Sequence, residues 1–559
     1  MNIKNKFLTN KKAMAALSAV SLIALAFGPA ASADFSAVNQ NTGFSTTNTV
    51  TATGVDTFSQ VNLNTEVVTN TATSTTDTGN NTSDNNTGDG SAMSGLLNIL
   101  GIFSNQLNLN VSTQSSGWWT GQFDAENNTT GSESENDASA TYVSTATISN
   151  TNDASIDNGV EVDANTGSNS ADNNTGDGEA ESGNATSTTT QHNTANGNAL
   201  IVEGNTLNDF FMGFSQNLIT GFSSTNNANT VAVNTFDLTN ENTAGFTNDS
   251  TTTLNTGDNT ASGNTGSGSV DGGNASGMAT ITNDANVNAL EVDLSGMDTN
   301  SLIAVNEETG SESENNANGT LVNSASVGNT NDASIDNTTS IEAMSGGSES
   351  NNNTGDGEVE GGDASGEILI DNGSGLNINE TTLSMGQGEF TMTSVNLTTG
   401  FSSENNANGV LVNTLDVTND NAATVSNSAD LELTSGENEA SNNTGDGSAE
   451  SGDADGEVTF INDMNINSTM ISMFSAGPMV AVNDTTGAES ENNATVTGVN
   501  SLTISNTNDS EVTNEATIEA NSGSNVSSGN TGSGSSSSGS STVIFGVTNQ
   551  GNGNSTVIE

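Results

Sequence analysis

The sequence predicts an all-β fold, most simply a repetitive β-solenoid, and three observations lead to that prediction. The pentapeptide Asn-Thr-Gly-Asp-Gly, or its variant Asn-Thr-Gly-Ser-Gly, recurs six times, with its first glycine at positions 88, 176, 266, 355, 445 and 532. A second Thr-Gly pair precedes each copy by 45 residues. Between these markers apolar and polar residues alternate with a period of two, which is the pattern of a β-strand.

Residues 1–33 have the organisation of a secretory signal peptide. Four lysines, the only basic residues of the chain apart from one histidine, occupy the first twelve positions, and an apolar run follows from Ala13 to Phe27. The small residues that come next end in an Ala-x-Ala site, so we expect cleavage after Ala33. The alternative is an N-terminal membrane anchor, which is disfavoured because the run is shorter than the ~20 residues of a membrane span. We therefore expect a secreted protein without a membrane span in its mature chain.

Residues 34–559 contain six repeats, and these form one β array rather than separate domains. The repeats open near residues 43, 131, 221, 310, 400 and 487. A fixed period of this kind is the signature of repeat architectures. Both halves of a repeat carry a turn and a strand pattern, so we expect each half-repeat to be one coil, and twelve coils would build a rod of about 60 Å at ~4.8 Å per coil. The repeats also alternate in type, because the second, fourth and sixth share features that the others lack.

Within the fifth repeat the pattern predicts two strands separated by a tight turn. The first strand extends from Gly409 to Thr418, the turn is Asn-Asp-Asn at 419–421, and the second strand ends at Thr434. Leu431 and Leu433 face one way, and the acids between them face the other. Asn, Asp and Gly are the residues that tight turns prefer.

Tandem β-sandwich domains of about 89 residues are the alternative architecture. A sandwich needs a core about 10 Å thick between its sheets. The chain is only 4% aromatic, and no Trp or Tyr recurs in every repeat. Small apolar residues with abundant Asn, Ser and Thr favour the thinner coil of a solenoid.

The charge balance limits the classes of partner. The chain has 67 acidic residues and a net charge of −63, and signal cleavage would remove every lysine. Such a surface repels nucleic acid and anionic membranes and attracts inorganic cations. The chain contains no cysteine, so its stability depends on packing, hydrogen bonds or metal.

The acidic turn is the candidate metal site. Four of its six copies carry an aspartate, and two carry serine at 267 and 533. Calcium takes 6–8 oxygen ligands, mostly carboxylates and carbonyls, so calcium is the cofactor that this turn would hold. The purely structural alternative is a turn in which Gly adopts positive φ and Asn or Asp bonds its own backbone. The candidate ligands are Asp89, Asp177, Asp356 and Asp446.

Other residues offer weaker signals. Trp118 and Trp119 either cap a hydrophobic core or stack on a sugar, and the lone His192 is most simply a surface residue. Apolar stretches such as 96–103, 210–214 and 470–474 are candidate contact surfaces. Because no constellation marks one catalytic site, we expect no enzyme, and a hydrolase acting through paired carboxylates is the least favoured alternative.

The turns Gly183-Asn184-Ala185 and Gly273-Asn274-Ala275, with Asn-, Thr- and Ser-rich alternating strands around them, resemble those of secreted bacterial β-solenoid proteins, including curli-like subunits. The resemblance implies an extracellular structural or adhesive protein of the cell surface, matrix or filaments. Its partners would be further copies of itself or cell-surface components. A secreted module that binds cations or glycans is the alternative function.

Overall fold

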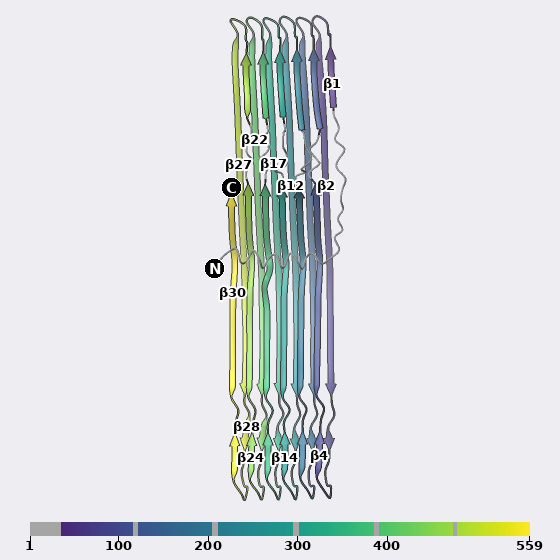
Figure 1. Cartoon of the computed structure of the whole chain (residues 1–559), viewed down its shortest axis with the longest axis vertical. Helices are drawn as coiled ribbons and strands as arrows, with labels where there is room; N and C mark the ends of the chain where they lie inside the picture. Colours follow the sequence, from purple (N-terminus) through teal and green to yellow (C-terminus); the bar gives the residue numbers. More distant parts are fainter. Residues whose placement is uncertain are drawn as a thin grey trace.

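The computed structural model describes residues 35–115, 121–203, 211–293, 301–384, 391–472 and 478–558. These segments form thirty β-strands and no helix. The strands make five parallel sheets of six strands each, here named A to E. Each repeat contributes one strand to every sheet, so six coils (β1–β5, β6–β10, β11–β15, β16–β20, β21–β25 and β26–β30) are stacked side by side (Figure 1).

Sheet B contains the longest strands, each of 31 residues, and makes one layer of the molecule. Its strands are β2 (Thr47–Asp77), β7 (Glu135–Asn165), β12 (Thr225–Asn255), β17 (Glu314–Met344), β22 (Glu404–Thr434) and β27 (Glu491–Asn521).

Sheets E and A make the opposite layer, against sheet B. Sheet E contains β5 (Leu97–Ser115), β10 (Ala185–Glu203), β15 (Ala275–Asp293), β20 (Ala364–Ser384), β25 (Ala454–Ser472) and β30 (Ser541–Ile558). Sheet A contains β1 (Phe35–Gln40), β6 (Gly121–Asn128), β11 (Phe211–Leu218), β16 (Ser301–Glu307), β21 (Thr391–Leu397) and β26 (Met479–Asp484).

Two sheets of short strands close the narrow end of the coil that is lowest in Figure 1. Sheet C contains β3 (Asn81–Thr82), β8 (Asn169–Ser170), β13 (Asn259–Thr260), β18 (Ser348–Glu349), β23 (Glu437–Glu439) and β28 (Ser524–Val526). Sheet D contains β4 (Gly90–Met93), β9 (Gly178–Glu181), β14 (Gly268–Asp271), β19 (Gly357–Glu360), β24 (Gly447–Glu450) and β29 (Gly534–Ser537).

The β-solenoid prediction is confirmed, and tandem sandwiches are wrong. Every pair of neighbouring strands is parallel and joins two different repeats. A sandwich domain would instead pair its own strands, in antiparallel order. Each repeat therefore depends on its neighbours for all of its ladder hydrogen bonds.

The expectation of one coil per half-repeat is wrong, because the 45-residue spacing separates the two narrow ends of a single coil. The turn at Gly43 leads into β2, and the turn at Gly88 follows β3 at the other end. A strand of 31 residues spans about 100 Å, whereas six coils at ~4.8 Å span only about 29 Å. The molecule is thus longest along its strands, as Figure 1 shows, and the predicted 60 Å rod of twelve coils does not exist.

The predicted turn at 419–421 is also wrong. β22 continues unbroken from Glu404 to Thr434, and Asn419 and Asn421 are fully buried inside the coil. Asparagine is a turn residue by local preference, but here its amide finds partners on neighbouring coils, and that tertiary bonding overrides the preference.

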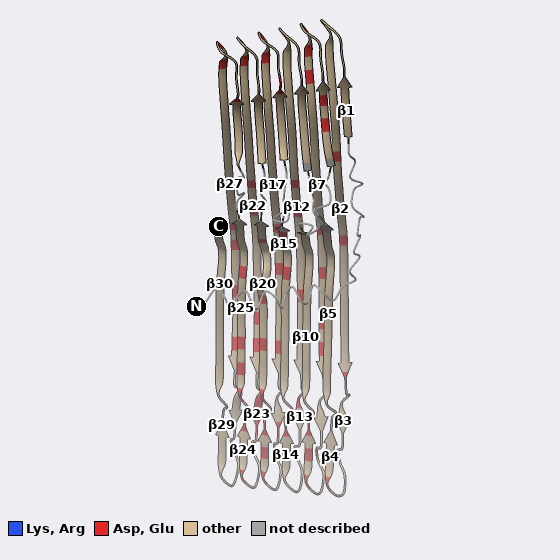
Figure 2. Ribbon diagram, turned by 45° about the horizontal axis from the view of Figure 1, so that its top comes forward, with Lys and Arg blue, Asp and Glu red and all other residues tan. Residues whose placement is uncertain are grey.

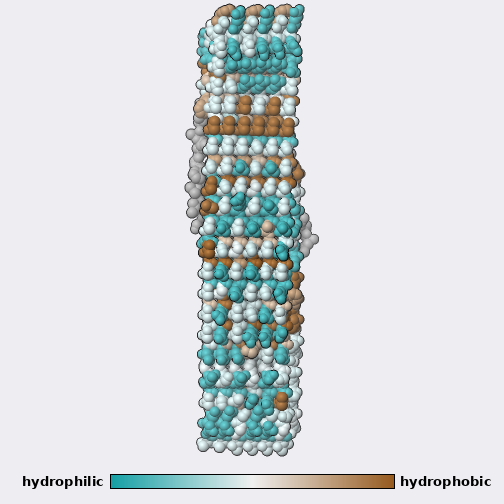
Figure 3. Space-filling view, turned by 180° about the vertical axis from the view of Figure 1, so that it is seen from behind, coloured by the Kyte–Doolittle hydropathy of each residue, from teal (hydrophilic) through white to brown (hydrophobic). Residues whose placement is uncertain are grey.

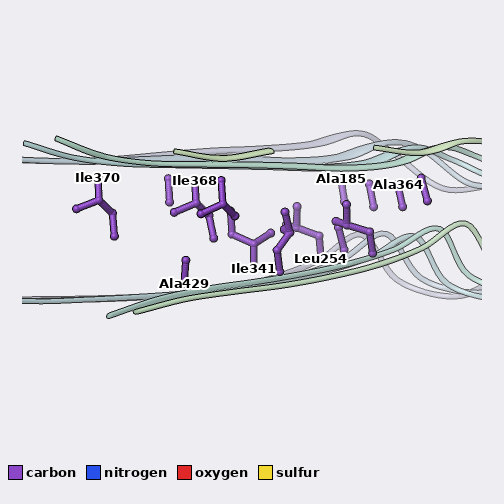
Figure 4. Packing of buried hydrophobic residues seen from close by; sticks show 14 of the residues in the cluster. Ala185, Leu254, Ile341, Ala364, Ile368, Ile370 and Ala429 are labelled. Carbon is purple, nitrogen blue, oxygen red and sulfur yellow. The ribbon is translucent and has the colours of Figure 1, made fainter. Parts of the chain in front are cut away.

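Inward-facing apolar residues form belts between the two layers. In the largest cluster Ile368 and Ile370 of sheet E face Leu254, Ile341 and Ala429 of sheet B, all of them 2% exposed or less (Figure 4). The other clusters repeat this arrangement nearer to sheet A and around Ile156 and Phe246. Burial of these side chains at about 25 cal/mol per Å² is the main apolar contribution to folding.

Belts of buried asparagine separate the apolar belts. Asn242 in β12 donates to Asn288 of the opposite layer at 2.9 Å and to Asn331 of the next coil at 2.7 Å. Its Oδ1 accepts from Asn152 and Asn198, each at 2.8 Å. Both hydrogens and both lone pairs of the amide are therefore bonded, which removes the cost of burying it. This zipper continues through all six coils.

A second two-layer zipper has the same geometry. It joins Asn158 of β7 to Asn193 of β10 at 2.9 Å and to Asn248 of the next coil at 2.9 Å. Single-layer ladders run parallel to the zippers, for example from Asn150 through Asn240 to Asn329. Each ladder fixes the register of the coils, because a slip by one residue would turn the amides outward and the outward residues inward.

We predict that Asn331→Ala destabilises the protein by at least about 2 kcal/mol. The substitution leaves one N–H on each of Asn242 and Asn288 without an acceptor, and a buried unsatisfied group costs about 1–3 kcal/mol. Thermal unfolding and amide hydrogen exchange of β17 would measure the loss. Thr330→Ala, on the outer face beside it, is the control, and an equal effect of both substitutions would contradict the role of the zipper.

Candidate functional site

The acidic turn lies at the narrow end of the coil, between sheets C and D, and its copies form a single file along the stack. Asp89, Asp177, Asp356 and Asp446 are all positioned there, at the outer surface of the turn. Ser267 and Ser533 continue the file in the third and sixth coils. The structure thus brings the four predicted ligands to one edge, with one carboxylate in each of the first, second, fourth and fifth coils.

Each aspartate of the file binds the backbone of the next coil. Asp89 Oδ1 accepts the N–H of Asp177 at 3.0 Å, and Asp356 Oδ1 accepts that of Asp446 at 2.8 Å. Ser267 Oγ replaces the carboxylate oxygen in the third coil and accepts from Asp356 at 3.2 Å. The same device recurs at the following turn, where Asp363 accepts from Asp453 at 2.9 Å. The expectation that these side chains bond their own backbone is therefore wrong, because the acceptor serves a neighbouring coil.

The glycines of the turn are required by close approach and not by positive φ. A Cβ on Gly176 would lie 2.1 Å from Asp89 Oδ1, and one on Gly445 would lie 2.1 Å from Asp356 Oδ1. The positive φ falls three residues earlier, for example on Asn173 at 58° and Asn442 at 60°. Asparagine tolerates this region better than other side chains do. Aspartate and glycine therefore act as a pair that spans two coils.

The calcium site remains a prediction. The Oδ1 atom of each aspartate already accepts a backbone N–H of the next coil. The described residues also contain no group of three or more acidic, His or Cys side chains that could hold a metal ion. Calcium needs 6–8 oxygen ligands, so it would have to take several from water and carbonyls.

Acids on the outer faces are offset between neighbouring coils. In sheet B, Asp237 and Asp416 occupy one column of the third and fifth coils, where the second, fourth and sixth have Thr147, Ser326 and Thr503. A second column reverses the order, with acids only in even coils: Asp153, Asp332 and Asp509. In these two columns the alternation between repeat types separates like charges that would otherwise be ~4.8 Å apart. Figure 2 shows these acids scattered over the ribbon.

Other columns place acids in consecutive coils. Sheet B has Glu314, Glu404 and Glu491 in one column, and one column of sheet D has an acid in four consecutive coils. The four acids of sheet D are Glu181, Asp271, Glu360 and Glu450. Loss of hydration, followed by the charge of Glu181, raises the pKa of Asp271 above its usual value. A raised pKa means that ionised Asp271 destabilises the folded protein, although its exposure to solvent keeps the effect small.

Sequence reasoning missed one buried polar pair. The hydroxyl of Tyr142 in β7 donates to Asp56 Oδ2 of β2 at 2.8 Å. Burial, followed by that hydrogen bond, raises the pKa of Tyr142 well above its ordinary range. The pair lies inside the coil, where its hydrogen bond joins the second coil to the first.

The two end coils are the other candidate site. β1, β2 and β5 form one open edge of the stack, and β26, β27 and β30 form the other. Most of the exposed large apolar side chains belong to these two coils; Leu63 is 71% exposed in β2 and Phe545 is 54% exposed in β30. Native proteins normally protect long, flat strand edges, because such edges pair with other chains. The stretch 96–103, expected to be a contact surface, lies largely in β5 on one of these edges.

The remaining predictions concern isolated residues. His192 is half-buried on the outer side of β10, 3.4 Å from the Thr194 hydroxyl. Trp118 and Trp119 lie outside the described residues, as do residues 1–33. The described segments contain no helix long and apolar enough to cross a membrane.

Comparison with known proteins gives no relative for this chain. No family model, no curated protein and no solved structure matches it. Its function must therefore be inferred from its own geometry.

We predict that Asp271→Asn raises the melting temperature at neutral pH. A carboxyl whose pKa is higher in the folded than in the unfolded protein contributes its full stability only below its pKa in the unfolded protein. That contribution is lost as pH rises through its pKa in the folded protein. The gain should therefore shrink as pH falls through the raised folded pKa and vanish below about 3.8, where the carboxyl is protonated in both states. Glu181→Gln should give part of the same gain. Equal melting temperatures of Asp271→Asn and the unaltered protein at pH 7 would contradict this account.

We also predict that Asp356→Ala destabilises the protein by about 1 kcal/mol, whereas Asp356→Asn is nearly neutral. Alanine removes the acceptor for the Asp446 N–H, and asparagine keeps it. Calorimetric melting with and without calcium measures both effects. If calcium stabilised the unaltered protein and that gain disappeared in both variants, the carboxylate would have a metal-binding role beyond its hydrogen bond.

Proposed function

We propose that this protein is a secreted, non-catalytic structural subunit that stacks end to end into filaments of the cell surface or extracellular matrix. The observation that carries the proposal is the match between the two open ends. All five sheets contain six strands, so the described residues make six whole coils and both ends present the same set of five strand edges. A second copy placed on the sixth coil continues every sheet.

The asparagine ladders have a direction that suits such stacking. Along the zippers, Nδ2 of one coil donates to Oδ1 of the next, as from Asn331 to Asn421 at 2.9 Å and from Asn421 to Asn508 at 3.0 Å. Acceptors are therefore left at the first coil, on Asn64, and donors at the sixth, on Asn508. Head-to-tail contact joins the two, and a head-to-tail contact that does not close into a ring produces an open filament.

Side-chain volumes also match across the junction. Phe545 occupies the column that begins with Gly101 in the first coil. A Cβ on Gly101 would meet no atom closer than 3.8 Å, so there is space over this glycine for part of a ring. The next inward columns would place Val543 on Ile99 and Val547 on Phe103. The apolar belts would thus continue from copy to copy.

Charge favours the junction as well. The acids of β2 are Asp56, Glu66 and Asp77, and their columns end in the sixth coil with Asn500, Ser510 and Asn521. No acid of sheet B would therefore meet an acid of the next copy. An even-type coil would be followed by an odd-type coil, which preserves the alternation found inside the molecule.

Secretion and the absence of catalysis rest on the sequence: the N-terminal segment predicts export, and no residue constellation predicts a reaction. A filament of this kind would present its acidic turns in continuous files. The second candidate function, binding of cations or glycans, is supported by those files and would add to the structural role.

We predict that the mature protein forms filaments whose subunits repeat every ~29 Å, with strands perpendicular to the filament axis and a ~4.8 Å meridional reflection. Asn508→Asp should shorten them severalfold, because a carboxylate would face Asn64 Oδ1 of the next copy; each 1.4 kcal/mol lost weakens association about tenfold. Electron microscopy and fibre diffraction provide the measurements.

Ser505→Asp is the matched control, since it adds the same charge on the outer face of the same strand, beside the uncharged Thr418 of the neighbouring coil. It should leave filament length nearly unchanged. Monodisperse single particles of the unaltered protein, at all concentrations and salt conditions, would sink the proposal.

A further inference from the structure

The outer face of sheet B carries a stripe without charge that crosses all six coils. Its central column consists of valine alone, and the columns on both sides contain only Thr, Val and Ser. Figure 3 shows the central column as an unbroken brown row between paler rows. We name these three columns the valine stripe; they are Thr53, Thr141, Val231, Thr320, Val410 and Thr497; Val55, Val143, Val233, Val322, Val412 and Val499; and Thr57, Thr145, Thr235, Ser324, Thr414 and Ser501.

The stripe is accessible and regular. Val55 and Val499, at the two ends, are 65% and 47% exposed, and the four valines between them are half-buried only by their neighbours in the column. On one side the next two columns are mostly asparagines that bond along the surface, for example Asn318 to Asn229 at 2.8 Å. These bonds hold polar side chains along the sheet, so the face remains flat.

We propose that the valine stripe pairs face to face with the same stripe of a second copy, related by a two-fold axis that runs along the stacking direction over the valine column. The contact uses the outer face and not the ends, so it goes beyond end-to-end stacking and does not require it. Both copies would stack in the same direction, and their sheet B strands would run in opposite directions.

Charge complementarity identifies a second copy as the partner. This axis pairs residues by their distance from the valine of their own coil. A residue that lies four positions before the valine in one copy faces the residue four positions after the valine in the same coil of the second copy. Asp237 then faces Asn229 of the second copy, Asp416 faces Asn408 and Asp137 faces Ser149. These three are the only acids in the three outward-facing columns on either side of the valines, and each one faces a residue that can donate a hydrogen bond.

The next columns set the limits of the contact. Glu404 would face Asp420 of the second copy, so repulsion begins there. The compatible region spans about 40 Å along the strands and about 29 Å across the coils, roughly 1,100 Å² per copy, which exceeds the ~800 Å² per partner of a standard interface. A polyanionic partner would be repelled by the acids around this region. Small, identical, interdigitating side chains are instead the composition of dry interfaces between paired sheets.

The absence of cysteine allows a direct test. Val322→Cys places one thiol at the axis in an otherwise cysteine-free chain. Paired sheets lie about 10 Å apart, which is too far for a disulfide, so a short bismaleimide is the probe. We expect Val322→Cys to cross-link to itself and Thr338→Cys, on the outer face of the same strand, to remain uncross-linked.

The off-axis positions test the symmetry. Thr320→Cys mixed with Ser324→Cys should cross-link at least severalfold more than either variant alone, because only the mixed pair is brought face to face. Val322→Glu should abolish the paired species in analytical ultracentrifugation, whereas Thr338→Glu should not. Equal cross-linking of Val322→Cys and Thr338→Cys, or no cross-linking of either variant, would overturn the proposal, as would unchanged pairing in Val322→Glu.

The experiment is done in the Asn508→Asp background as well. If end-to-end stacking fails but the stripe pairs, a discrete two-copy particle remains and cross-links as before. If the stripe fails but stacking is correct, filaments persist in the unaltered protein at the width of one solenoid. If Val322→Glu instead lost binding to a polysaccharide while the cross-links were absent, the stripe would be a glycan site and the pairing proposal would be wrong.

Discussion

The side-chain amide of asparagine holds this molecule in register. An amide has two donors and two acceptor positions, and in the two-layer zippers an interior residue such as Asn242 uses all four, two across the layers and two along the stack. Such a residue is satisfied only when the neighbouring coils carry asparagine at the same position. The apolar belts alone would tolerate sliding, whereas the amides between them would not. The fixed spacing of the repeats follows from this requirement.

The same interaction explains why the ends invite further copies. A ladder that is complete in every interior coil is incomplete by construction at the first and the last. The end coils could have compensated with a polar cap, as terminal repeats of solenoids normally do. Within the described residues they present open strand edges and exposed apolar side chains. The ladders of self-complementary coils therefore set no limit on the number of coils that can be stacked.

Electrostatics limits this self-complementarity and shapes the outer surface. No lysine or arginine follows Lys12, so carboxylates of the coils cannot be paired with such cations and must be kept apart. The alternation of odd and even repeats achieves this in several columns of sheet B, where Asp237 and Asp332 occupy different columns of adjacent coils. Asp271 of sheet D has an acid in the same column of both neighbouring coils, and loss of hydration, followed by the charge of Glu181, raises the pKa of its carboxyl. The valine stripe is the region from which charge is left out altogether.

The fold class, the number of repeats and the acidic, disulfide-free chemistry can all be read from the sequence, because period and alternation are properties of the chain. The sequence also predicts that Asp89, Asp177, Asp356 and Asp446 share one turn, but not that each binds the backbone of the next coil. It wrongly predicts a turn at Asn419 and Asn421, since local preference treats asparagine as a turn residue. It also wrongly predicts one coil in each half-repeat, because both halves carry a turn and a strand pattern. These points depend on tertiary structure, because the stacking partners of the amides and of these carboxylates lie about 89 residues away, in a neighbouring coil. For the same reason the valine stripe, scattered at one residue per repeat, becomes a surface only when the coils are stacked.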